Sequence, residues 1–163
     1  MNKTKVVSSP KVKSSRKPMV LKAKIANKTR VVKLPARLSQ RGENLRLQLF
    51  SDINFEGDRI VFNAGEVAVR DMRILGFNDV LSSFRMRNSD DRREVSLVLF
   101  EDINYQGRFK IYRGSRNIRN LVDEGFNDLA SSLVFVARRI SNSRVRQIQR
   151  DQRPPGAVLE IRR

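Results

Sequence analysis

Hydrophobic and polar residues alternate along two segments of the chain. Leu45, Leu47 and Leu49 are separated by polar residues, and Leu97 and Leu99 repeat the alternation fifty residues later. A period of two is typical of β-strands with one buried face. Because each alternating run is short, the pattern predicts a chain built from short strands.

The apolar pattern belongs to an internal repeat. The segment LQLFSDINFEGDRIVF starting at Leu47 recurs as LVLFEDINYQGRFKIY from Leu97, an offset of fifty. Downstream, GFNDVLSSFRM from Gly76 reappears as GFNDLASSLVFV from Gly125, an offset of forty-nine. Two blocks in the same order indicate a duplicated motif. One copy alone would leave an apolar sheet face wet, so about eight strands from both copies are expected to form a sandwich of two antiparallel sheets.

The first block of the repeat combines two aromatic residues with a glycine in both copies. It runs aromatic, four residues, aromatic, one residue, glycine, and glycine at that point permits a positive φ so that the chain folds over a packed ring. The stretches MRIL and IRNL between the blocks fit either a loop or one helical turn. The hairpin pattern is structural in both copies, which contain Phe50, Phe55 and Gly57, then Phe100, Tyr105 and Gly107.

Charge divides the chain into three parts. The formal net charge is +17, and it splits into +12 over residues 1–44, −1 over 45–137 and +6 over 138–163. A nearly neutral middle indicates an ordinary globular domain, 45–137, with motifs at 45–87 and 95–137. The basic N-terminal segment 1–44 and C-terminal segment 138–163 are expected to be flexible. Within them, 30–34 is a short β-like run, and 144–149 could pair with 157–161 as a hairpin.

Two missing residue types narrow the chemistry. The chain has no cysteine and no histidine, which excludes thiolate sites, disulfides and every histidine-based base or metal site. Pairs such as Asp52 with Asp58 show no nucleophile, base and orienting partner arranged as a unit. Carboxylate pairs of the glycosidase kind stay open on sequence alone. We expect a protein that is not an enzyme.

The second repeated block is rich in oxygen donors. It reads Asn-Asp-x-x-Ser-Ser in both copies, and hard oxygen at close spacing is what Ca²⁺ selects. Mg²⁺ fits less well, because it demands a small octahedral shell and keeps its waters. The alternative is that Asn-Asp makes a turn and the serines bond nearby backbone. Retention of the oxygen pattern in both copies favours a shared constraint, which either the fold or an ion could supply.

Hairpin and oxygen-rich loop together, twice and in order, closely resemble the microbial calcium-binding βγ-crystallins. The resemblance covers about residues 45–137. It implies an all-β, βγ-crystallin-like Greek-key sandwich of two motifs, here with basic flexible termini, and two Ca²⁺ sites. Each site would be shared between the hairpin of one motif and the loop of the other. The lack of tryptophan departs from many relatives but does not touch the sites.

The resemblance also implies the ligands. The carbonyl of Glu56 would join the loop Asn127–Ser131, and the carbonyl of Gln106 would join the loop Asn78–Ser82. Ser83 and Ser132 are expected to tie a strand to the folded hairpin, a structural role. The implied metal residues are Glu56, Asn78, Asp79, Val80, Ser82, Gln106, Asn127, Asp128, Leu129 and Ser131.

The basic ends suggest a polyanionic partner. Flexible bases without interleaved aromatics bind nucleic acid, anionic membrane or acidic cell-surface polymers by counterion release, and a merely solvated tail is the simpler alternative. No stretch reaches membrane-spanning length, and no secretory signal peptide is evident, which slightly favours a cytoplasmic protein. A transit peptide fits the serine-rich start, although Pro10 and Pro18 argue against its helix. The rival function is therefore a nucleic-acid or anionic-polymer binding protein whose sandwich is only a scaffold.

Overall fold

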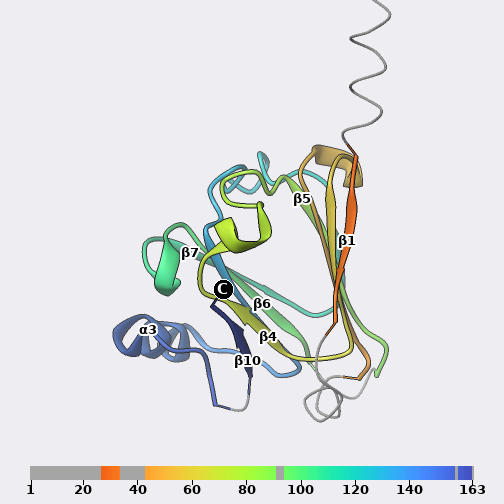
Figure 1. The fold of residues 1–163 in the computed structure, drawn as a ribbon. Coiled ribbons are helices and arrows are strands. Elements are labelled where there is room, and N and C mark those ends of the chain that lie inside the picture. Colours follow the sequence, from red (N-terminus) through yellow and green to blue (C-terminus); the bar gives the residue numbers. More distant parts are fainter. Residues whose placement is uncertain (1–26, 34–42, 91–93, 157, 163) are drawn as a thin grey trace, which may run out of the picture.

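The chain folds into two packed β-sheets (Figure 1). A computed structural model describes residues 27–33, 43–90, 94–156 and 158–162. In spatial order, the first sheet contains β1 (Thr29–Val32), β3 (Arg59–Asn63), β2 (Leu45–Phe50), β5 (Ser83–Asn88) and β8 (Arg116–Ile118). The second sheet contains β10 (Leu159–Ile161), β4 (Val67–Val69), β9 (Ser132–Val136), β6 (Ser96–Phe100) and β7 (Phe109–Arg113).

The two motifs exchange their third strands. In the first motif, β2 pairs antiparallel with β3 on one side and β5 on the other, but β4 pairs with β9 in the other sheet. Strands β6, β7 and β9 of the second motif form the same arrangement, and β8 pairs with β5. Each sheet therefore contains strands from both motifs. The predicted all-β Greek-key sandwich is confirmed.

The core lies between the sheets and follows the alternation of the sequence. Leu47, Leu49, Leu97 and Leu99 are fully buried, and the register pairs Leu47 with Met86 and Leu97 with Phe135 on the inner faces. Inward residues at period two from both sheets make one contiguous apolar cluster. The predicted half-buried strands are thus found where the leucine pattern placed them.

The short segments that the sequence left open differ between the motifs. The MRIL stretch forms one turn of 3₁₀ helix, η2 (Met72–Leu75), with the side chain of Asp71 accepting a hydrogen bond from the N–H of Arg73. The equivalent IRNL stretch begins in β8 and continues as a turn. Each hairpin contains a further 3₁₀ turn, η1 (Ile53–Phe55) and η3 (Ile103–Tyr105).

Both ends of the described chain add to the sandwich. Strand β1 runs parallel to β3, as the β-like run at 30–34 predicts, and β10 runs parallel to β4. The predicted hairpin between 144–149 and 157–161 is wrong, because 144–149 lies in helix α3 (Asn142–Asp151). The expected flexibility of the C-terminal segment is corrected for the same reason. Of the basic N-terminal segment, residues 1–26 and 34–42 lie outside the described residues.

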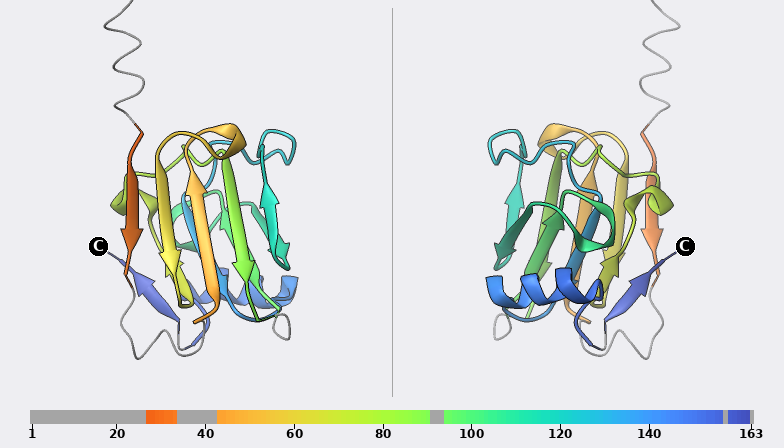
Figure 2. Two further views of the ribbon diagram at one scale, coloured as in Figure 1. Left: turned by 90° about the vertical axis from the view of Figure 1, so that its right-hand side faces the viewer. Right: turned by 90° about the vertical axis from the view of Figure 1, so that its left-hand side faces the viewer.

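Helix α3 forms because one face of it is apolar. Ser141 caps its N-terminus by accepting a hydrogen bond from the N–H of Arg144, and Val145 and Ile148 are buried against the outer face of the second sheet. A period-two reading of 144–149 missed this spacing of three residues, which is helical. Figure 2, right, shows α3 lying across that sheet. In the described ranges no helix is long and apolar enough to cross a membrane.

Candidate metal centre

The two oxygen-rich loops meet where the motifs join. The N–H of Asp79 donates to the carbonyl of Ala130 (3.2 Å), and the N–H of Asp128 donates to the carbonyl of Leu81 (3.1 Å). Both aspartates have φ of 54°, a left-handed conformation that aspartate tolerates better than most residues. The loops are therefore related by an approximate two-fold arrangement, with each aspartate directed across the junction.

Each aspartate side chain contacts the serine of the opposite loop. The hydroxyl of Ser82 donates to Oδ1 of Asp128 at 3.1 Å, and the hydroxyl of Ser131 donates to Oδ1 of Asp79 at 3.1 Å. The Ser82 hydroxyl also lies 3.4 Å from the carbonyl oxygen of Val80. Carboxylate, hydroxyl and carbonyl oxygens thus gather in a first cluster of Val80, Ser82 and Asp128. The second cluster has Asp79 and Ser131, with Leu129 at the position equivalent to Val80.

This grouping differs from the one expected from the sequence. We expected Asp79 with Ser82 in one site and Asp128 with Ser131 in the other. In the folded chain each carboxylate contacts the serine of the other motif, and both aspartates have a left-handed backbone. Nothing in the sequence signals the exchange, because both copies contain the same residues.

Each hairpin region makes backbone hydrogen bonds with its own motif and with the other motif. The N–H of Ser82 donates to the carbonyl of Phe50 and that of Ser131 donates to the carbonyl of Phe100, so each loop lies beside its own hairpin strand. The N–H of Asn54 donates across the junction to the backbone carbonyl of Arg119, and the N–H of Asn104 donates to the backbone carbonyl of Arg70. The resemblance implied that the carbonyl of each hairpin joins the loop of the opposite motif, whereas the loop N–H groups of Ser82 and Ser131 bond to strands of their own motif.

Glu56 and Gln106 occupy equivalent places but have different neighbours. Their carbonyls accept hydrogen bonds from the N–H groups of Asp52 and Asp102 within the hairpins, at 3.1 and 3.0 Å. The side chain of Glu56 is exposed, whereas that of Gln106 donates 2.7 Å to the carbonyl of Gln149 in α3. The second hairpin is therefore held by the helix.

The structural role expected of the second serine in each loop is confirmed. Ser83 donates to the carbonyl of Asp52 and accepts from the N–H of Phe55 at 3.0 Å. Ser132 makes the same pair of bonds with Asp102 and Tyr105. Both serines are fully buried, so their hydroxyls fasten the folded hairpins to the sheet.

The asparagines of the loops have unsatisfied oxygens. The Oδ1 atoms of Asn78 and Asn127 are buried without a hydrogen-bond partner among the described residues, while Nδ2 of Asn78 donates 2.7 Å to Asp79. Buried acceptors without a partner are costly in a folded protein. The same side-chain oxygen therefore lacks a partner at the equivalent point of both loops.

The oxygen spacing fits Ca²⁺. Oxygens bound to this ion at 2.3–2.6 Å lie about 2.8–3.5 Å from their neighbours in the coordination shell, and the contacts of 3.1 and 3.4 Å in the first cluster fall within that range. Each cluster has one carboxylate and otherwise neutral oxygens. In the part of the chain that the structure describes, no group of three or more His, Cys, Asp or Glu side chains could hold a metal ion. The residues therefore fit a weakly charged calcium shell completed by backbone and solvent.

Solved βγ-crystallin structures are similar to this chain. A structure concerning the evolution of the eye lens βγ-crystallin domain fold is 26% identical over 66% of this chain and 94% of its own, with a TM-score of 0.49. A βγ-crystallin from Ciona intestinalis is 25% identical over 54% of this chain and 95% of its own, with a TM-score of 0.45. A βγ-crystallin from an archaeon is 19% identical over 56% of this chain and 98% of its own, with a TM-score of 0.43.

No family model matches the chain, and no curated protein matches it. The strand order itself establishes the architecture, because the third strand of each motif lies in the sheet of the other. The described part of the chain is therefore a βγ-crystallin-like Greek-key sandwich of two motifs.

Proposed function

We propose that the protein binds two Ca²⁺ ions at the junction of its motifs, and that binding stabilises a structural or stress-related domain. The observation that supports this most strongly is the paired contact of Asp79 with Ser131 and of Asp128 with Ser82. Turn chemistry alone would need only contacts within each loop. Carboxylates that cross to the other motif bring charge and hydroxyl oxygen together instead.

The residues explain how binding would stabilise the fold. Val80, Ser82 and Asp128 would hold one ion, Asp79, Leu129 and Ser131 the other, and the carbonyls of Glu56 and Gln106 are candidates to complete the shells. Bound Ca²⁺ supplies positive charge to oxygens from both motifs. The serine hydroxyls would turn their protons away from the aspartates and present lone pairs. Because the clusters exist only when the motifs are docked, binding favours the folded state.

Thermal unfolding of the full chain in chelator and in millimolar Ca²⁺ tests the proposal. At about 100 times the dissociation constant, each independent site adds about 2.7 kcal/mol, and each kcal/mol raises the midpoint by roughly 2–8 °C. The rise should vanish in the double variant Asp79→Asn with Asp128→Asn. The matched control is Asp123→Asn with Asp151→Asn, which removes the same charge at exposed positions.

Calorimetric titration of the native chain should give a stoichiometry near two. A native chain that shows neither heat of binding nor a rise in midpoint would reduce the two loops to turn chemistry. An equal rise in the Asp79 and Asp128 double variant would place calcium elsewhere on the molecule.

We also propose that the basic ends tether the domain to an anionic partner. On α3 the bases Arg144, Arg146 and Arg150 are exposed, opposite the buried Val145 and Ile148. Deleting residues 1–26 is the suitable test, since a cut at residue 44 would also remove β1 from the sheet. Unchanged retention of the shortened chain on an anionic resin, with its Ca²⁺ response intact, would contradict a role for the N-terminal bases.

A further inference from the structure

The outer face of the first sheet is open. Figure 2, left, shows this sheet face-on, with no described element in front of it. The outer face of the second sheet is covered by α3, whose Val145 and Ile148 pack with Val98, Phe100 and Val134. The outer faces of the two sheets are built from corresponding strands of the repeat, but only that of the second sheet is covered by a described helix.

Corresponding positions of the repeat have opposite chemistry on the two faces. In the first sheet, four of the nine outward positions of β2, β3 and β5 are arginine, and the corresponding positions of the second sheet are mostly apolar. Five pairs differ in this way: Arg46 with Ser96, Gln48 with Val98, Arg59 with Phe109, Arg85 with Val134 and Arg87 with Val136. An uncovered face requires only polar residues, and mixed charge is the common solution. Arginine at four of the nine outward positions, with no acid among them, is a more specific outcome.

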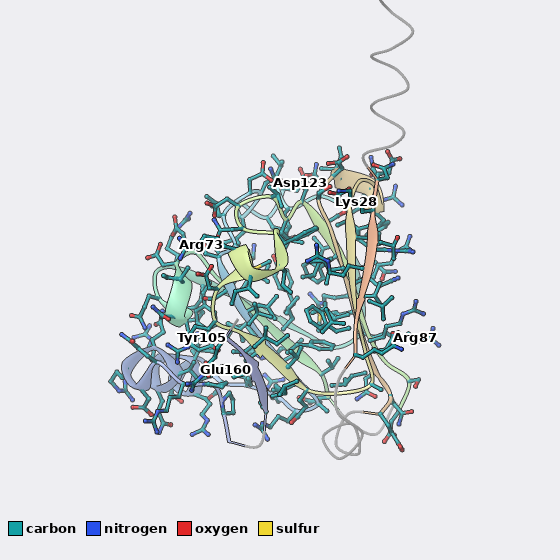
Figure 3. All side chains as sticks on the ribbon, viewed as in Figure 1. Lys28, Arg73, Arg87, Tyr105, Asp123 and Glu160 are labelled. Carbon is teal, nitrogen blue, oxygen red and sulfur yellow. The ribbon has the colours of Figure 1, made fainter. Side chains whose placement is uncertain are left out.

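We call Arg46, Arg59, Arg85 and Arg87 the arginine face. The five strands of the first sheet contain no aspartate or glutamate. Acids occur only beyond the strand ends, as with Glu43, which lines a hollow of about 280 Å³ with Arg46 and Arg87. In Figure 3 the side chain of Arg87 extends away from the sandwich, on the side opposite α3.

Two of these arginines oppose each other directly. Arg46 and Arg87 are register partners across β2 and β5, which puts their Cα atoms roughly 4.5–5.5 Å apart. Like charges at directly opposed positions destabilise a sheet. Within the described residues neither arginine has an ion-pair partner within 4.0 Å. An anion between them would relieve the repulsion.

The other two arginines are held in fixed orientations. The guanidinium of Arg85 lies 4.1 Å from the centre of the Phe55 ring, which fixes its plane on the surface. Arg59 donates to Thr29 at 3.3 Å, and its Nε is buried without a partner among the described residues. The face thus combines a preorganised guanidinium plane at Arg85 with exposed guanidinium groups at Arg46 and Arg87.

We propose that the arginine face binds single-stranded nucleic acid. Guanidinium groups match phosphate oxygens in a bidentate manner, and a row of them along neighbouring strands can follow a phosphodiester backbone. A base can stack on the guanidinium plane of Arg85, which already rests on Phe55. A duplex would meet a flat sheet along a narrow line only, whereas a single strand can lie across it.

The test uses the full chain and a fluorescent oligothymidylate of about 20 nucleotides, with anisotropy measured over a range of salt concentrations. The variant Arg46→Gln with Arg87→Gln should weaken binding at least about 10-fold and lower the salt slope by about 1–2, since each phosphate contact contributes about 0.7. The matched control, Arg73→Gln with Arg108→Gln, removes the same charge from exposed positions outside the arginine face and the basic ends, and should change affinity less than about 3-fold.

Thermal unfolding of each variant shows that it is folded, so that a loss of binding is not a loss of structure. Equal affinities of the two double variants would overturn the proposal and leave the binding to net charge. Tighter binding of a duplex of the same length, of heparin or of anionic vesicles than of the oligothymidylate would also overturn it, by identifying another class of partner.

Discussion

The hydroxyl of Tyr105 donates a hydrogen bond of 2.7 Å to Oε1 of Glu160, joining the second hairpin to strand β10 (Figure 3). Arg70 donates to the same carboxylate at 3.0 Å, and Arg162 also pairs with it. The side chain of Glu160 is only 8% exposed. The C-terminal strand is thus held by a polar network as well as by its pairing with β4.

This network makes stability depend on pH. Burial raises the pKa of Glu160, but hydrogen bonds from Tyr105 and Arg162 and the charge of Arg70 outweigh it, so the pKa lies below its ordinary value. The carboxylate therefore stabilises the fold above about pH 4.3, the value in unfolded chains, and this contribution is lost as pH falls through the folded pKa.

We expect Glu160→Gln to destabilise the protein by about 1–3 kcal/mol at neutral pH, because hydrogen bonds to a charged acceptor are replaced by weaker ones. The difference from the native chain should shrink as pH falls from about 4.3 through the lower folded pKa of Glu160, where the carboxylate becomes neutral. Urea unfolding across this range is the measurement. A difference that stays constant down to pH 3 would show that the charge of Glu160 does not contribute.

The repeat predicted the sandwich for a physical reason. Alternating leucines from Leu45 and from Leu97 define which face of each strand is buried, and two copies define which faces can pack together. Strand exchange between the sheets was not readable, because it depends on how the motifs dock. Helix α3 was missed because Val145 and Ile148 have helical spacing over too short a stretch to stand out among arginines.

The candidate site was predictable in its residues but not in its grouping. Two loops with the same oxygen donors cannot say whether Asp79 faces its own serine or that of the other copy, and the docking of the motifs places it beside Ser131. The arginine face was likewise hidden, since its members are scattered over β2, β3 and β5 and meet only in the folded sheet.

Glycine is required in the hairpin for two separable reasons. Gly57 has φ of 80°, and a Cβ at that position would lie 2.2 Å from Oγ of Ser51. Gly114 has the same φ of 80° but open space around it. Gly114→Ala should therefore cost about 1–2 kcal/mol for the left-handed backbone alone. Gly57→Ala should cost at least 1 kcal/mol more, because the hairpin must also shift.

Chemical denaturation of the two glycine variants measures the difference. Equal costs would mean that the hairpin of the first motif yields without loss, and that the glycine there serves only the backbone conformation.

The exchange of carboxylates between the loops predicts which residues are energetically coupled. In millimolar Ca²⁺, Asp79→Asn and Ser131→Ala should be non-additive by about 0.5–3 kcal/mol, because both act on one cluster. Asp79→Asn and Ser82→Ala should be closer to additive, since they act on different clusters. Double-mutant cycles from thermal unfolding give both values. The reverse order of coupling would restore the grouping within each loop.

Arg87 is expected to destabilise the first sheet while it supports the binding of single-stranded nucleic acid. Its register partner is Arg46, and removing one of two directly opposed like charges should stabilise the sheet by about 0.2–1 kcal/mol. We therefore expect Arg87→Gln to raise the unfolding midpoint in low salt and to weaken oligothymidylate binding at the same time. The stabilisation should diminish as salt screens the repulsion. The control, Arg146→Gln, lies on α3 away from this pair and should leave the midpoint nearly unchanged. A midpoint that falls in Arg87→Gln would mean that this side chain contributes packing to the sheet, and that its repulsion with Arg46 is negligible.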